Sequence, residues 1–154
     1  MEERKERILG LSELLTGFAR IDLLGTGMTD IYFCELDEVL PANTLDELLD
    51  AYWRLSKGGE HNDAAASEIL GDPKLGPVAR NLILLWYCGT WTKLPGAWCA
   101  AYGVSSQDRD ADRVLSAAAY QAALQWVVAG AHPAGAQQQG YGAWATAPRR
   151  GGHE

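Results

Sequence analysis

The side chains that could support catalysis or bind a metal are few and scattered along this sequence. The cysteines and histidines are Cys34, Cys88, Cys99, His61, His132 and His153. None of their spacings matches a zinc site, a Cys-x-x-Cys redox motif or a haem-attachment motif, so we predict no metal site. Cys88 and Cys99 could form a disulfide across a loop or remain buried free thiols, and the sequence leaves both alternatives open.

Support for an enzyme is correspondingly weak. A cysteine nucleophile would need Cys99 or Cys88 to meet His132 in space, and we keep an enzyme that uses Cys99 and His132 as an alternative. The adjacent carboxylates Asp37 and Glu38 lie on a predicted helix, where neighbouring side chains point in different directions. They therefore lack the convergent geometry that an acid–base pair requires.

A nucleotide-binding loop is also poorly supported. Gly25 and Gly27 suggest one, but Asp30 stands where a dinucleotide-binding loop has its third glycine. We expect a turn there. Taken residue by residue, the sequence favours a helical binding or accessory protein over an enzyme.

Residues 72–89 contain the strongest structural signal in the chain. Asp72 can accept hydrogen bonds from the first free N–H groups of a helix, and Gly89 suits the left-handed conformation that ends one. Between them, apolar residues occupy nearly every side of the helix. Such a helix is buried on nearly every side, so we predict that it forms the centre of the core.

Helical periodicity and helix-capping residues recur through the rest of the chain. Further helices are predicted over residues 2–20, 29–40, 43–57, 60–71 and 111–129, with an aromatic-rich loop at 89–110. Thr44 and Glu47 have the spacing of a capping box. No strand pattern or internal repeat is present. We predict an all-α fold, with a compact helical domain over 1–130 and an extended, irregular C-terminal arm over 131–154.

Charge and aromatic residues are unevenly distributed. The net charge of −7 disfavours nucleic acid as a partner. Residues 1–72 contain 16 acidic and 6 basic residues, whereas residues 73–154 contain 4 and 7. This asymmetry fits either two faces with different neighbours or a solvated acidic surface beside an aromatic core. The longest apolar run, Leu82–Cys88, is too short for a membrane span, which needs about 20 residues.

Large aromatic side chains in the predicted loop and arm require a cover, which either the chain's own domain or a partner could provide. Aromatic residues are common anchors of protein interfaces. We therefore predict a set of partner-contacting residues, namely Trp91, Trp98, His132, Tyr141 and Trp144.

Several segments, taken in order, resemble a known family. They are residues 11–18 (LSELLTGF), 69–89 with its terminal WYCG, 120–126 (YQAALQW), 130–133 (GAHP) and 140–148 (GYGAWATAP). Together they are similar to the small, or gamma, subunits of bacterial FAD-dependent sugar and polyol dehydrogenases, the sorbitol dehydrogenase small-subunit family.

The resemblance implies a non-catalytic subunit that binds and stabilises a large FAD-dependent oxidoreductase of the glucose-methanol-choline type and assists its folding or export. FAD would belong to that partner, with no cofactor in this chain, and a cytochrome c subunit is a further implied partner. The family implies a periplasmic location. The first residues lack a signal peptide, so a cytoplasmic location stays open. A free-standing or homo-oligomeric helical scaffold is a further alternative.

Overall fold

A computed structural model gives the fold and describes residues 2–56 and 63–133. The helices are α1 (Glu2–Thr16), α2 (Arg20–Gly25), α3 (Thr29–Val39), α4 (Thr44–Leu55), α5 (Asp63–Gly71), α6 (Leu75–Cys88), α7 (Gly96–Tyr102), α8 (Ala117–Ala122) and α9 (Gln125–Ala129). Two short strands, β1 (Thr90–Trp91) and β2 (Arg113–Val114), pair in antiparallel fashion. The predicted all-α class is confirmed for the described part of the chain.

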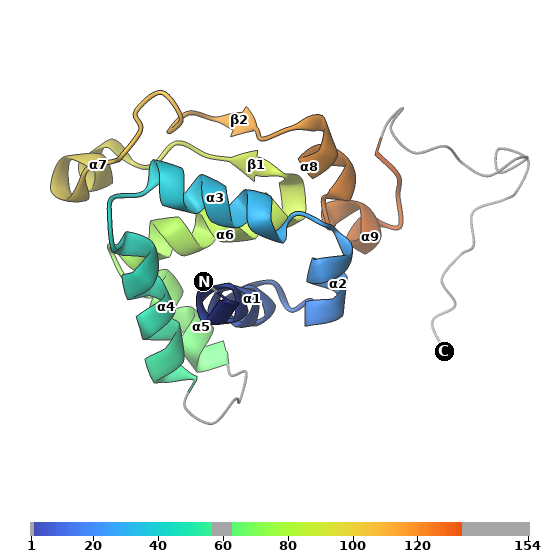
Figure 1. Cartoon of the computed structure of the whole chain (residues 1–154), viewed down its shortest axis with the longest axis horizontal. Coiled ribbons are helices and arrows are strands. Elements are labelled where there is room, and N and C mark those ends of the chain that lie inside the picture. Colours follow the sequence, from blue (N-terminus) through green and yellow to red (C-terminus); the bar gives the residue numbers. More distant parts are fainter. Residues whose placement is uncertain (1, 57–62, 134–154) are drawn as a thin grey trace, which may run out of the picture.

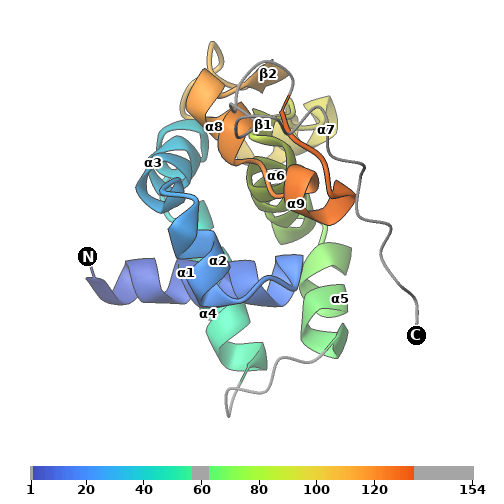
Figure 2. The same ribbon diagram turned by 90° about the vertical axis from the view of Figure 1, so that its right-hand side faces the viewer.

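Helices α1 and α6 share the centre of the core. Helix α1 runs across the middle of the molecule, with α4 and α5 on one side of it and α3 and α6 on the other (Figures 1 and 2). The Trp86 indole of α6 donates a 2.9 Å hydrogen bond to the Ser12 hydroxyl of α1. Its ring packs edge-on against Tyr32 of α3, with centroids 5.0 Å apart. One tryptophan thus joins three helices, and the predicted central position of α6 is confirmed.

Both ends of α6 form as the sequence predicts. The Asp72 carboxylate accepts hydrogen bonds from the backbone N–H groups of Lys74 (2.8 Å) and Leu75 (2.7 Å). Gly89 ends the helix with φ +65°, the left-handed conformation that glycine adopts without strain. The helix itself begins at Leu75, three residues after Asp72.

The predicted capping box of α4 is wrong. Thr44 is the first residue of the helix and is buried, and neither it nor the preceding Asn43 makes a side-chain capping bond. The Glu47 carboxylate forms an ion pair with Lys74 instead. A tertiary contact has therefore replaced the local hydrogen bond that the spacing indicated.

Residues 89–129 are divided into more helices and strands than the sequence predicts. The expected loop over 89–110 contains β1 and α7, and the expected helix over 111–129 is split into β2, α8 and α9. Ser116 begins α8 by accepting a hydrogen bond from the Ala119 N–H (3.0 Å). The Leu124 N–H then bonds to the Trp86 carbonyl (3.0 Å) rather than continuing that helix. Strands of two residues are too short to produce a periodic signal.

Candidate functional site

Two of the predicted contact residues, Trp91 and Trp98, lie inside the core. Trp91 is 1% exposed and Trp98 is 4% exposed. The Trp91 indole N–H donates to the Asp110 carboxylate (3.0 Å), and that of Trp98 donates to the Lys74 carbonyl (2.8 Å). The chain's own domain thus provides their cover. Their predicted role as partner contacts is corrected, because almost no indole surface is left for a second protein.

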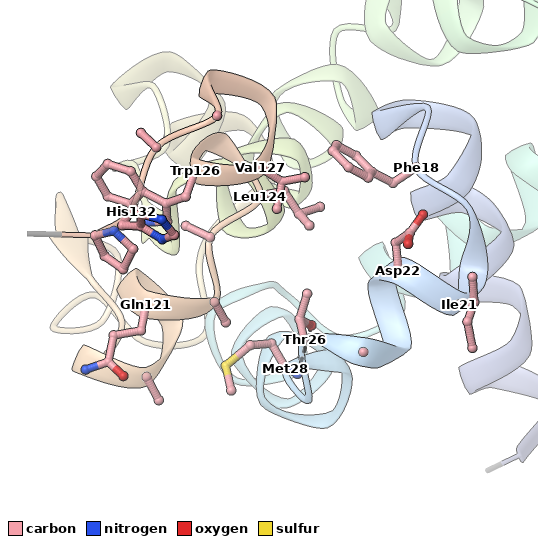
Figure 3. A pocket seen from close by; sticks show the side chains of 17 residues that line it. Phe18, Ile21, Asp22, Thr26, Met28, Gln121, Leu124, Trp126, Val127 and His132 are labelled. Atoms are coloured by element: carbon pink, nitrogen blue, oxygen red, sulfur yellow. Dashed lines mark hydrogen bonds between the residues drawn. The ribbon is translucent and has the colours of Figure 1, made fainter. Parts of the chain in front are cut away.

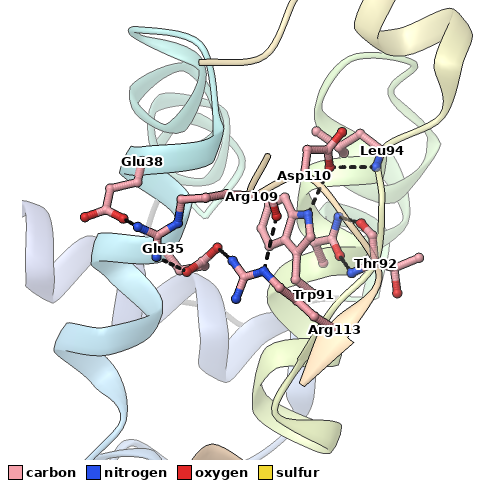
Figure 4. A network of polar contacts seen from close by, with 9 residues as sticks. Glu35, Glu38, Trp91, Thr92, Leu94, Arg109, Asp110 and Arg113 are labelled. Carbon is pink, nitrogen blue, oxygen red and sulfur yellow. Dashed lines mark hydrogen bonds and ion pairs between the residues drawn. The ribbon is translucent and has the colours of Figure 1, made fainter. Parts of the chain in front are cut away.

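A buried carboxylate organises the loop that carries these tryptophans (Figure 4). One oxygen of Asp110 accepts hydrogen bonds from the Trp91 indole and from the Leu94 backbone N–H at 2.9 Å. The other oxygen lies 3.6 Å from the Cys99 sulfur. Sequence reasoning missed this residue, because Asp108, Asp110 and Asp112 alternate in one short stretch and nothing in their spacing indicates which is buried.

A second buried acid, Glu35 on α3, holds the same loop from the other side. Glu35 is 3% exposed, and its carboxylate pairs with Arg109 (2.9 Å) and with Arg113, as Figure 4 shows. Arg109 also pairs with Glu38. The two arginines thus fasten residues 109–113 to α3. Because the Glu35 charge is fully paired, we assign it a structural role rather than one as a free acid or base.

The cysteine and histidine of the enzyme alternative sit in different surroundings. Cys34, Cys88 and Cys99 are all free thiols. Burial, and next the neighbouring Asp110 carboxylate, raise the pKa of the Cys99 thiol. A nucleophilic cysteine needs the opposite, a pKa lowered by nearby positive charge. His132 is exposed and makes no side-chain hydrogen bond or ion pair with the described residues.

We expect Cys99 to react slowly with iodoacetamide. At neutral pH its alkylation, followed by peptide mass spectrometry, should be about tenfold or more slower than that of the exposed Cys34. An alkylation rate of Cys99 that levels off below roughly pH 8.5 would instead support the enzyme alternative.

The raised pKa of the Cys99 thiol also makes stability depend on pH. As pH rises, the unfolded chain loses the thiol proton before the folded chain does. The stabilising contribution of the protonated thiol is therefore present below roughly pH 8.5 and declines above it.

A broad apolar groove lies between α2 on one side and α8 and α9 on the other (Figure 3). It is formed by residues 18–28 and 118–133 and has a volume of about 910 Å³; we call it the α2/α9 groove. Its large apolar lining residues include Phe18, Met28, Leu124 and Trp126. Ile21 and Val127 also line it and are 74% and 69% exposed. Large apolar side chains left in water beside a hollow are typical of a binding surface.

The groove contains little reactive chemistry. Asp22 and His132 are the two titratable side chains among its lining residues, which are otherwise apolar or uncharged. His132 is therefore the one predicted contact residue that the structure places at this surface. Tyr141 and Trp144 lie outside the described residues. An apolar lining with two separate titratable groups fits binding by shape and burial better than catalysis.

Comparison of the chain with known protein families, curated proteins and solved structures found no match. Within residues 2–56 and 63–133, no group of three or more His, Cys, Asp or Glu side chains could hold a metal ion. The helices of this part include none with the length and apolar character needed to cross a membrane.

Proposed function

We propose that this chain is a non-catalytic accessory subunit that binds and stabilises a large FAD-dependent oxidoreductase of the glucose-methanol-choline type, as a folding or export chaperone. The observation that carries the proposal is the α2/α9 groove, an apolar surface with two exposed aliphatic side chains, Ile21 and Val127. Because these side chains are 74% and 69% exposed, covering what remains of each would contribute about 1–2 kcal/mol to binding.

The polar network supports a structural rather than a catalytic role for the rest of the chain. The carboxylates of Glu35 and Asp110 already bind groups of this chain, so neither is free to act on a substrate. The raised pKa of Cys99 keeps that thiol protonated. Chemistry would therefore belong to the partner.

The identity of the partner rests on the order of the motifs in the sequence. The segments from 11–18 to 140–148 are similar to those of the small subunits of FAD-dependent sugar and polyol dehydrogenases. On this basis FAD binds to the large subunit, and that subunit sets the substrate. A cytochrome c subunit would complete the assembly as a further partner.

Co-purification tests the proposal. The tagged full-length chain, produced in cells of its source organism, is expected to co-purify with a flavoprotein that carries FAD absorbance, whereas the separated chain binds no FAD. If no flavoprotein is recovered and light scattering shows the chain as a stable homo-oligomer, the scaffold alternative replaces this function. FAD retained by the separated chain would also contradict it.

A further inference from the structure

We propose that in the free chain the α2/α9 groove is occupied by the chain's own C-terminal segment, residues 134–154, with Tyr141 and Trp144 as its anchors. This occupancy goes beyond the proposed function, because it concerns the chain before any partner binds. A partner that uses the same groove would have to displace the segment.

The segment starts at the groove itself. Pro133, the last described residue, is buried and belongs to the groove lining. Tyr141 and Trp144 follow it by 8 and 11 positions. An extended chain spans about 3.3 Å per residue, which gives these side chains a reach of roughly 26 and 36 Å from Pro133. A tether this short also holds them at an effective concentration of about millimolar beside the groove.

The two surfaces also match in polarity. The groove offers Phe18, Leu124 and Trp126 beneath a rim on which Ile21 and Val127 are exposed. The segment consists largely of glycine, alanine and glutamine, which cannot build a core of their own. Its two large aromatic side chains are therefore its main source of binding energy, and an apolar hollow is the surface that suits them.

Charge complementarity adds a second point of attachment. Asp22 lines the groove, and its carboxylate forms no ion pair with any described residue. Arg20, two positions earlier, is already paired with Glu6 and Glu13. The segment carries two adjacent cations, Arg149 and Arg150, beyond its aromatic anchors. Their positive charge suits them as partners for the Asp22 carboxylate.

Site-specific photo-crosslinking of the full-length chain tests this occupancy. Benzoylphenylalanine replaces Trp144, and the purified chain is irradiated with no flavoprotein present. We expect crosslinks within one chain, mapped by mass spectrometry to residues 18–28 or 118–133. Crosslinks that map elsewhere in the same chain, crosslinks between two copies, or the absence of any crosslink would each overturn the proposal.

Variants of the groove make the test specific. In the same photoreactive chain, Ile21→Asp and Val127→Asp should each lower the groove crosslink about tenfold, because each removes the burial of one aliphatic side chain. Ile31→Asp is the control, since Ile31 is 44% exposed on α3 and does not line the groove. Circular dichroism is used to check that each variant is folded. Equal crosslinking in all three variants overturns the proposal. Because no partner is present, this result is independent of the co-purification result.

Discussion

Replacing Gly89 with alanine is expected to lower the free energy of unfolding by about 2–5 kcal/mol. Gly89 has φ +65°, and a Cβ built there would lie 2.5 Å from the Ala119 carbonyl oxygen and 2.6 Å from its carbon. The alanine must therefore adopt a left-handed conformation and also push the backbone of α8 away. Because α8 forms one wall of the α2/α9 groove, the substitution should disturb the groove as well.

Urea unfolding of the Gly89→Ala and Gly130→Ala variants separates the cost of the left-handed conformation from the cost of the steric contact with α8. Gly130 ends α9 with φ 60° and ψ 31°, close to the 65° and 25° of Gly89, but a Cβ there meets nothing within 4 Å. Gly130→Ala should therefore show only the conformational cost of about 1–2 kcal/mol. Equal losses in both variants would mean that the contact between Gly89 and α8 contributes nothing to stability.

Removing the Asp110 carboxylate should lower the free energy of unfolding by a similar amount. In Asp110→Ala, the indole N–H of Trp91 and the backbone N–H of Leu94 both lose their buried acceptor. Each buried donor left without a partner costs about 1–3 kcal/mol, so we expect a total loss of about 2–6 kcal/mol. The segment that contains Trp91 and Leu94 would lose the group that holds it to residue 110. Urea unfolding measures the resulting change in the free energy of unfolding.

Asp108→Ala is the matched control for this carboxylate. Asp108 is exposed, stands two positions from Asp110 and forms no hydrogen bond or ion pair with the described residues. Its replacement should change stability by no more than about 0.5 kcal/mol. A loss for Asp108→Ala as large as that for Asp110→Ala would show that net charge matters here, rather than the buried hydrogen bonds.

Local signals were sufficient to predict the helical class and the ends of α6. The cap at Asp72 and the stop at Gly89 depend on residues adjacent in sequence, and both form as predicted. The predicted capping box at Thr44 does not form, because the Glu47 carboxylate binds the Lys74 ammonium group, 27 positions away in sequence. The β1–β2 pair, likewise, joins segments that no short-range pattern connects.

Most of the candidate site could not be predicted from the sequence, because it too depends on contacts between distant segments. The α2/α9 groove joins residues 18–28 to residues 118–133, so neither segment alone shows a hollow. Residue type alone also gave a wrong expectation for Trp91 and Trp98. Tryptophan is a common interface anchor, but both indole N–H groups donate to acceptors inside the fold. Ile21 and Val127 have the chemistry of core residues, yet they are among the large apolar side chains left exposed.

The most direct test of the central claim, that the α2/α9 groove is the docking surface for a flavoprotein, is the FAD recovered with tagged groove variants. Ile21→Asp and Val127→Asp are predicted to lower the recovered FAD about tenfold each, which corresponds to about 1.4 kcal/mol of lost binding free energy. Ile31→Asp should retain the wild-type recovery. Equal recovery in all three variants, or a loss confined to Ile31→Asp, would contradict the assignment of the groove.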